Sequence, residues 1–360
     1  MEFLIEYGMF LAKATTIVLA IVIVIAVLAS SGQRSRKPGK KGSLKISRLN
    51  EHFDDMKEAL RGSVLEKKEL KQLHKEEKKQ EKELAKQEAK AAKAEAQQES
   101  ESGESAGSRK KRVYVINFKG NIAADAVSSL REEISAILTM AEAEDEVMLR
   151  LESPGGMVHA YGLASSQLVR LRNAKIPLTI CVDKVAASGG YMMACLADRL
   201  VAAPFAIIGS IGVLVQLPNF HKVLQKYDVD YEMISAGEYK RTLTTFGEIT
   251  QKSRDKVQED VETIHDIFKS WVKEHRPSVE IDKVATGETW LGSQAKERYM
   301  VDDIKTSDEY IIDACKQADV FEIEYEFQKT IQDKLGRVLE EGVARAVSRW
   351  FQQTHIDKYQ

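Results

Sequence analysis

The chain has 360 residues, enough for two or three domains and a large buried core. Its formal net charge of −2 carries no nucleic-acid signature, and charged residues, 30% of the chain, are concentrated between positions 33 and 112. The three cysteines, Cys181, Cys195 and Cys315, are an odd number at spacings that match no metal motif. We therefore expect buried thiols rather than a disulfide framework, which weakly disfavours an oxidising compartment.

The N-terminal segment has the pattern of a membrane anchor. Residues 14–30 are almost wholly apolar, and with Phe10 and Leu11 the run reaches about 20 residues, enough to cross a bilayer. We expect an uncleaved anchor over residues 1–31; the alternative is a cleavable signal peptide, because residues 29–32 are small. Basic side chains follow the run, and the positive-inside rule places this flank in the cytoplasm. They are Arg34, Arg36, Lys37, Lys40, Lys41, Lys45 and Arg48.

A basic flank and a charged segment come next, over residues 32–111. Between 51 and 98 the chain is mainly Glu, Lys, Ala and Gln, and its scattered leucines do not sustain a heptad. High helix propensity and mixed-sign charges favour a solvated helix, and the same composition is also typical of disorder. Residues 99–107 are rich in Ser, Gly and Glu and predict a flexible linker. The whole segment would act as a spacer between the membrane and the module that follows.

From residue 112 onward the apolar pattern alternates between strand and helix, which predicts an α/β fold with mostly parallel strands. The apolar region 201–217 contains Pro204 and Gly209, so we expect buried strands and turns there rather than a second membrane span. An amphipathic helix is also expected at 335–351. Strands are expected at 113–118, 146–151 and 178–182, and helices at 123–140, 157–171, 191–196 and 251–273.

Ser188 lies in the turn between the apolar strand 178–182 and the helix that follows. The first N–H groups of a helix have no partner inside it and attract negative charge, which suits a nucleophilic serine. Gly189 and Gly190 leave room for a substrate carbonyl to approach. The alternative is a small-residue turn in which Ser188 only caps the helix.

Three further stretches surround this serine in the sequence. Gly155 and Gly156 follow the strand 146–151, where two backbone N–H groups can face an oxyanion. Ser210 lies in a glycine-flanked turn, and Lys240 lies in the stretch 237–241. Taken alone, each of these pieces is a weak signal.

In their order along the chain, these pieces resemble the signal peptide peptidase A family of serine proteases. The nearest likeness is to its single-module, membrane-anchored bacterial branch, the SohB type, over roughly residues 113–305. One departure is that the family often has a Gly-Leu-Val-Asp turn where this chain has Tyr299-Met300-Val301-Asp302. The resemblance implies a Clp-protease/crotonase-like fold, a spiral of βαβ units.

The resemblance also implies roles for individual residues. Ser188 would be the nucleophile and Lys240 the general base of a Ser-Lys dyad, with Ser210 helping to hold the lysine. The backbone N–H groups of Gly189 and of Gly155 or Gly156 would form the oxyanion hole.

A lysine serves as a base only when it is neutral, and burial beside apolar groups favours the neutral amine. Near the proposed base the chain offers Tyr239, Leu243 and Phe246 for this purpose, together with Arg241, which would help by repulsion, and Glu238, which would hinder. A serine–histidine site is the alternative, with His159 or His221 as base, although neither has an obvious orienting carboxylate.

We therefore expect a membrane-anchored serine endopeptidase that cleaves signal-peptide remnants or other membrane-associated polypeptides. Two alternatives share the fold: a crotonase-like enzyme acting on acyl-CoA, and a non-proteolytic scaffold. No metal or organic cofactor and no nucleic acid is implied, and the resemblance implies a ring-like homo-oligomer.

The expected location is the bacterial inner membrane; the basic flank favours a cytoplasmic module, whereas the family analogy favours the periplasm. The expected domains are 1–31 (anchor), 32–111 (linker), 112–310 (peptidase module) and 311–360 (C-terminal strand and helix extension).

Overall fold

The computed structural model describes residues 15, 42–79, 82–83, 86 and 110–327. The chain folds as two compact units, residues 1–43 with 326–360, and residues 44–325. Almost all described residues belong to the second unit, which is the subject below. The expected anchor at 14–30, apart from Thr15, and the expected helix at 335–351 lie outside the described residues. No described helix is both long enough and apolar enough to span a bilayer.

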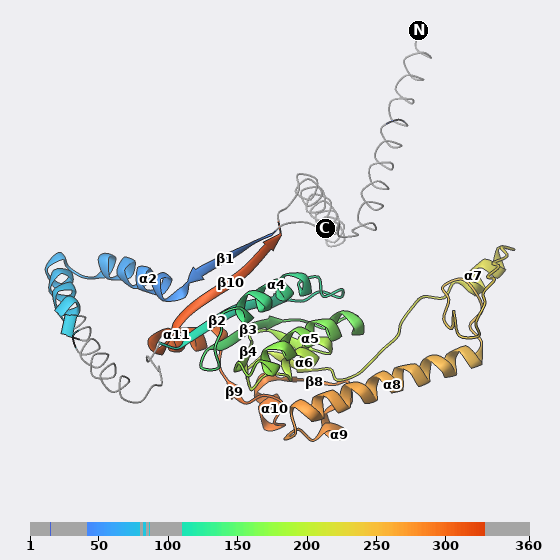
Figure 1. Cartoon of the computed structure of the whole chain (residues 1–360). Coiled ribbons are helices and arrows are strands. Elements are labelled where there is room, and N and C mark those ends of the chain that lie inside the picture. The colour runs from blue at the N-terminus through green and yellow to red at the C-terminus, as the bar shows by residue number, and fades with distance from the viewer. Residues whose placement is uncertain (1–14, 16–41, 80–81, 84–85, 87–109, 328–360) are drawn as a thin grey trace, which may run out of the picture. The chain divides into compact units, whose positions relative to one another are not determined.

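The centre of the second unit is a seven-stranded sheet in the order β1-β10-β2-β3-β4-β6-β9 (Figure 1). From β10 to β9 every neighbouring pair is parallel, so the predicted α/β class with mostly parallel strands is confirmed. The strands are β1 (Gly42–Arg48), β2 (Arg112–Lys119), β3 (Glu146–Glu152), β4 (Leu178–Val182), β6 (Arg199–Ala202), β9 (Asp303–Ile304) and β10 (Asp319–Phe327).

The central strands are apolar on both faces because helices cover both faces of the sheet. On β2, Tyr114 and Ile116 belong to the larger core cluster, whereas Val113 and Val115 belong to a smaller cluster on the other face. Helices α4 (Val127–Leu138), α5 (Val158–Asn173) and α6 (Gly189–Ala194) supply the larger cluster, and α2 (Leu49–Val64) and α11 (Ser307–Gln317) contribute to the smaller one.

A second, three-stranded sheet is formed by β5 (Val185–Ala187), β7 (Ile207–Gly209) and β8 (Thr289–Leu291). β5 and β7 are parallel, and β8 is antiparallel to β7. β6 and β7 therefore confirm that the apolar region from 201 contains buried strands. The remaining helices between residues 110 and 327 are α7 (His221–Lys226), α8 (Gln251–His275), α9 (Ile281–Val284) and α10 (Gly292–Glu297).

In the charged region before the module, residues 49–64 and 67–79 are helical. α2 and the helical residues 67–79 are joined by a short turn, and Arg61 contacts Glu77 at 2.8 Å while Glu58 contacts His74 at 2.7 Å. The base of α2 is tied to the sheet, since the Asn50 side-chain amide donates to the carbonyl oxygen of Ala318 and its oxygen accepts from Val320 N–H. Residues on both sides of positions 111 and 310 therefore share one sheet.

The turn at Tyr299 is present although the chain lacks the glycine expected there. Tyr299 has φ of 58°, in the left-handed region that glycine favours, directly after α10. Its N–H donates to Lys296 O at 3.0 Å, and Met300 N–H donates to Ala295 O at 3.0 Å. Asp302 then pairs with the buried Arg276 at 2.7 Å. The tyrosine thus adopts the glycine conformation at a cost in backbone strain.

Candidate active site

Ser188 occupies a strained position between β5 and α6. Its backbone has φ of 52° and ψ of −119°, an unusual conformation for a residue other than glycine. Its N–H donates to Gly209 O at 2.8 Å, and its carbonyl oxygen accepts from Met192 N–H at 3.0 Å. Although Ser188 stands at the N-cap position, its side chain makes no capping hydrogen bond. The interpretation of Ser188 as a mere helix cap is therefore wrong, and the half-buried hydroxyl is not used by the helix.

The diglycine turn after β3 packs directly against this serine. A Cβ on Gly155, whose φ is 89°, would lie 2.7 Å from Ser188 Cβ. A Cβ on Gly156 would lie 2.2 Å from the carbonyl oxygen of Ile122. Neither position can hold a side chain without moving backbone, so close approach explains both glycines.

The two glycines of this turn direct their N–H groups differently. Gly155 is buried, and its N–H donates to Ser153 Oγ at 3.1 Å. Gly156 is exposed, and neither its N–H nor that of Gly189 has a hydrogen-bond partner within residues 110–327. Two backbone donors beside Ser188 are thus available to a ligand.

Ser210 is placed next to Ser188 by the pairing of two short parallel strands. Ala187 on β5 is in register with Gly209 on β7, so the two serines follow neighbouring strand ends. Ser210 has the same positive φ as Ser188, 52°, and its N–H donates to Glu288 O at 2.6 Å. The structure therefore brings together Ser188, Ser210 and the glycines named from the sequence.

Lys240 lies apart from this group in the single chain. It belongs to residues 213–250, here called the lysine segment, none of which is buried. Lys240 lines a surface pocket of about 310 Å³ with Asp260 and other residues of the first half of α8. By contrast α6 contacts the second half of α8, where Trp271 Nε1 donates to Met192 O at 3.0 Å. Asp260 and Trp271 are ~16 Å apart along the helix axis, at about 1.5 Å per residue.

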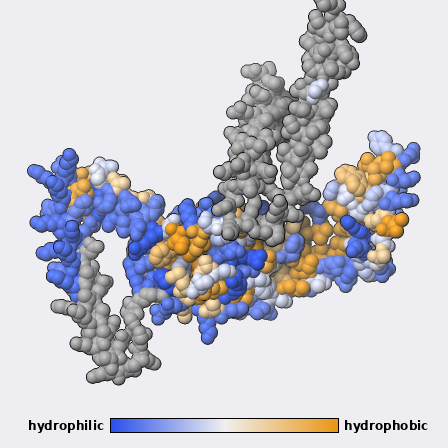
Figure 2. Space-filling model, turned by 45° about the horizontal axis from the view of Figure 1, so that its top comes forward, coloured by the Kyte–Doolittle hydropathy of each residue, from blue (hydrophilic) through white to orange (hydrophobic). Residues whose placement is uncertain are grey.

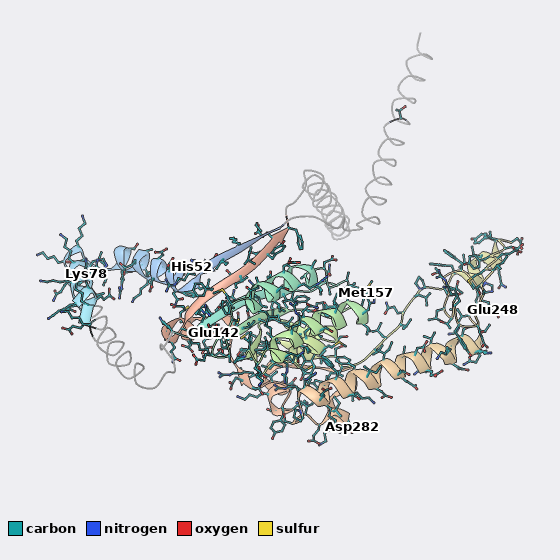
Figure 3. The ribbon with its side chains drawn as sticks, in the orientation of Figure 1. His52, Lys78, Glu142, Met157, Glu248 and Asp282 are labelled. Atoms are coloured by element: carbon teal, nitrogen blue, oxygen red, sulfur yellow. The ribbon has the colours of Figure 1, made fainter. Side chains whose placement is uncertain are left out.

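The surroundings of Lys240 also differ from those expected. We predicted burial of the lysine beside apolar groups, and in the single chain it is exposed. Glu238 forms an ion pair with Lys252, so it is engaged away from Lys240. Figure 3 shows the separation through labelled neighbours: Met157, beside the diglycine turn, lies in the body of the unit, and Glu248, in the lysine segment, lies at the far end of α8.

The histidine alternative finds no support in the hydrogen bonds. His159 is exposed on α5, and His221 begins α7. Among the residues described between 110 and 327, neither ring forms a hydrogen bond, so no carboxylate orients either imidazole. A histidine base would need such an orienting partner.

The cysteines are free thiols, as expected. Cys181 and Cys195 are buried and Cys315 is half-buried. Burial raises the pKa of the Cys181 and Cys195 thiols to about 12, which keeps both protonated and unreactive. Within the described part of the chain, no three His, Cys, Asp or Glu side chains are grouped so that they could hold a metal ion.

This α/β fold has a strained serine at the turn from β5 to α6, and two backbone N–H groups at the glycines near it have no partner within residues 110–327. These are the features of a serine hydrolase. Comparisons with known proteins narrow this class. The family model described as Peptidase family S49 N-terminal matches residues 2–168, and the model described as Peptidase family S49 matches residues 170–321.

Similar chains are found among curated proteases. The probable protease SohB of Haemophilus influenzae is 47% identical, over 97% of this chain and 96% of its own length. The probable protease SohB of Buchnera aphidicola subsp. Schizaphis graminum is 46% identical, over 88% of each chain. Protease 4 of Haemophilus influenzae is 29% identical over 56% of this chain and 34% of its own length.

The chain belongs to peptidase family S49, in its SohB-type branch, and is a serine endopeptidase. This confirms the resemblance expected from the ordered motifs. It also sets aside both alternatives that share the fold, the acyl-CoA enzyme and the non-proteolytic scaffold. Sequence reasoning missed the buried pair Ser153 and Tyr161, whose hydroxyl oxygens are 2.5 Å apart and whose serine accepts from Gly155 N–H. The available signal was a serine directly before Pro154-Gly155-Gly156, followed by a tyrosine on the next helix.

Proposed function

We propose that the peptidase uses a Ser-Lys dyad, with Ser188 as nucleophile and Lys240 as general base. The observation that carries the proposal is the strained Ser188, whose side chain makes no capping bond and which packs against the diglycine turn. In the reaction Ser188 Oγ attacks the scissile carbonyl while neutral Lys240 takes the hydroxyl proton. The lysine then gives this proton to the departing amine, and water releases the acyl group by the same route.

The oxyanion hole in this proposal is formed by the N–H groups of Gly156 and Gly189. Both are without partners among residues 110–327, whereas Gly155 N–H is bonded to Ser153 Oγ. Each such donor typically contributes about 3 kcal/mol in the transition state. Ser210, next to Ser188 on the neighbouring strand, would orient the lysine amine.

We further propose that Lys240 acts on Ser188 of a neighbouring subunit in a ring-like homo-oligomer. The support is the exposed lysine segment, whose large apolar side chains face outward; Figure 2 shows hydrophobic patches at this end of the unit, and patches of this kind mark interaction sites. Covering this surface would bury the lysine amine and favour its neutral form. Its exposed large apolar residues are Leu214, Val215, Phe220, Val223, Tyr227, Val229, Tyr231, Met233, Ile234, Tyr239 and Phe246.

The proposal also includes the finer architecture and the location. We infer a Clp-protease/crotonase-like spiral, supported by the two sheets with largely parallel pairing.

We infer an inner-membrane anchor from the apolar run 14–30, with the module on the cytoplasmic side on the basis of the basic flank. Substrates would be signal-peptide remnants or other membrane-associated polypeptides. Spheroplasts treated with external protease test the side: digestion of the module would place it in the periplasm.

Two variants and their mixture test the dyad. Purified full-length Ser188→Ala and Lys240→Ala proteins should each lose turnover of fluorescein-labelled casein, by a factor on the order of 10⁶ for the serine. Co-expression of the two variants should restore about a quarter of the wild-type rate, because random mixing pairs an intact serine with an intact neighbouring lysine at one site in four.

The outcomes separate the two parts of the proposal. Near-wild-type cleavage by Ser188→Ala would remove it as the nucleophile, and the same result for Lys240→Ala would remove the lysine base. If both variants are inactive and the mixture stays inactive, the dyad stands but is formed within one chain. An inactive but folded His221→Ala protein would favour a histidine base instead.

A further inference from the structure

A chain of hydrogen bonds runs beneath the proposed oxyanion hole. Gly155 N–H donates to Ser153 Oγ at 3.1 Å, Ser153 Oγ and Tyr161 Oη are 2.5 Å apart, and Tyr161 Oη donates to Asn121 O at 2.9 Å. It links the diglycine turn after β3, the first turns of α5 and the loop after β2. Neither of its two side chains, Ser153 and Tyr161, has been given a part in the reaction so far.

The direction of the chain follows from counting hydrogens. A tyrosine hydroxyl has one hydrogen, and here the carbonyl oxygen of Asn121 receives it. The bond between Ser153 and Tyr161 must then use the serine hydrogen, which leaves Ser153 Oγ to accept from Gly155 N–H. Burial raises the pKa of Tyr161, so its hydroxyl remains a donor throughout the neutral range. Each group has one defined role, which makes the arrangement rigid.

Both side chains are fully enclosed. Ser153 and Tyr161 each have 0% exposure, so neither can contact substrate directly. The backbone of Ser153 is held as well, since its N–H donates to Val185 O at 2.8 Å and its carbonyl oxygen accepts from Ala187 N–H at 3.0 Å. Ser153 therefore joins the strand before the diglycine turn to β5, the strand that ends at Ser188.

The same two residues support the other oxyanion donor. A Cβ on Gly189 would lie 2.4 Å from Tyr161 Cγ, and a Cβ on Gly190 would lie 2.5 Å from the Ser153 carbonyl oxygen. The first turn of α6 thus rests on the Tyr161 ring and the Ser153 backbone. The positions of Gly189 N–H and of the diglycine turn are set by a single buried pair.

We propose that Ser153 and Tyr161 are positioning residues for the oxyanion hole. By holding Gly155 N–H inside the protein, Ser153 turns the next peptide so that the exposed Gly156 N–H faces the substrate. The Tyr161 ring sets the position of Gly189 N–H on the other side. The inference rests on the proposed oxyanion role of Gly156 and Gly189, and it adds two residues that act only through those glycines.

Kinetics of the full-length, detergent-solubilised protein test this inference. Outright loss of an oxyanion donor typically lowers kcat by about 10²–10³-fold, so we expect a fall of about 10- to 100-fold for Ser153→Ala, which misdirects a donor without removing it. Tyr161→Phe, which keeps the ring under Gly189, should lower kcat by about 5- to 10-fold. KM for a quenched fluorescent peptide should stay within about twofold, because the ground-state carbonyl gains little from the donors.

Two more readouts separate positioning from mere structural support. A peptide aldehyde forms an oxyanion-bearing adduct with the serine, so its affinity should fall about in parallel with kcat. The midpoint of the pH–rate profile should not move, since neither hydroxyl exchanges a proton with substrate. The effects of the two substitutions should be less than additive in the double variant, because both act through one hydrogen-bond chain.

Ser165→Ala is the matched control. Ser165 lies on the same helix as Tyr161 and is equally buried, and its Oγ has no partner in the described part of the chain. It should leave kcat and aldehyde affinity unchanged. Unchanged kcat in Ser153→Ala or Tyr161→Phe, or a fall in kcat with no loss of aldehyde affinity, would overturn the inference. If Ser153→Ala does not fold, the nearly isosteric Tyr161→Phe decides alone. Because Ser188→Ala tests the nucleophile separately, failure here leaves the proposed dyad intact.

Discussion

The proposed nucleophile and the proposed base lie in two regions with opposite physical character. Around Ser188, glycines with no room for a Cβ, short parallel strands and the buried Ser153–Tyr161 pair hold the backbone through close contacts. Around Lys240, none of residues 213–250 is buried, and large apolar side chains face outward. A single chain therefore has a rigid environment at the proposed nucleophile and an uncovered one at the proposed base, which is the pattern expected if a partner subunit supplies the missing contacts.

The prediction with the largest expected effect replaces the proposed base, Lys240, by a residue that keeps the positive charge. Lys240→Arg should lower turnover of labelled casein by roughly 10³-fold or more, because a guanidinium stays protonated and cannot accept the serine proton. Lys222→Arg, on exposed α7 in the same segment, is the control and should keep wild-type activity. Equal activity in the two variants would mean that the lysine segment contributes no base.

A second prediction concerns the second unit outside the lysine segment, here called the body. Glu133 on α4 has 3% exposure, and burial raises the pKa of its carboxyl from 4.5 to about 7. The folded state then holds the proton between pH 4.5 and 7 while the unfolded state loses it, so stability falls as pH rises through this window. The shift corresponds to about 3 kcal/mol at most.

Glu133→Gln should remove this dependence, since an amide does not titrate. Thermal unfolding of the wild-type and variant proteins at pH 4.5, 6 and 7.5 measures the effect. Parallel loss of stability in the two proteins across the window would refute the role of Glu133.

The third prediction addresses the apolar surface of the lysine segment. Ile234 is 97% exposed in the single chain, so a charge there costs nothing within one subunit. If the segment is covered by a neighbour, Ile234→Asp should weaken assembly and lower activity about tenfold, the equivalent of ~1.4 kcal/mol. Leu60→Asp, at 67% exposure on α2, is the control. Sedimentation of both proteins in detergent gives the subunit state, and an unchanged, active Ile234→Asp oligomer would contradict the proposed contact.

The smallest expected effect lies at the turn after α10. Tyr299→Gly should raise the stability of the body by about 1 kcal/mol, because glycine adopts a positive φ without the steric cost that tyrosine bears. Calorimetry of the full-length variant should show a slightly higher melting temperature with unchanged activity. A lower melting temperature would mean that the tyrosine ring contributes more than its backbone strain removes.

The regions also differ in how far their structure could be predicted. Strands β2, β3 and β4 and helices α4, α5 and α8 were predictable, because their apolar residues follow the periods of strand and helix. The turn at Ser188 was predictable because two adjacent glycines after an apolar strand indicate a tight turn in which a side chain or another segment comes close to the backbone. The position of Lys240 was not, since the segment around it has no regular period and its contacts depend on tertiary or subunit packing.

Two further features escaped prediction for different reasons. The Ser153–Tyr161 bond joins a strand end to a helix, and no local pattern records which hydroxyls meet across such a distance. The docking of α2 was hidden by its charge: only Leu49 and Phe53 pack on the smaller core cluster, and Asn50 supplies the rest through backbone bonds. Because α2 is attached mainly by the Asn50 side chain and has few apolar residues, its sequence resembles that of a linker.

The place of β1 beside β10 has a practical consequence for anyone who wishes to work with the catalytic part in solution. A truncated form that begins near residue 110 would remove β1 and α2 together, and with them the partner of β10 and the bonds from Asn50. β10 would then become the edge strand of the sheet. The N–H and C=O groups on its outer side would be unpaired and could bind a strand of another molecule. A soluble form should therefore begin before Gly42, so that it still contains β1.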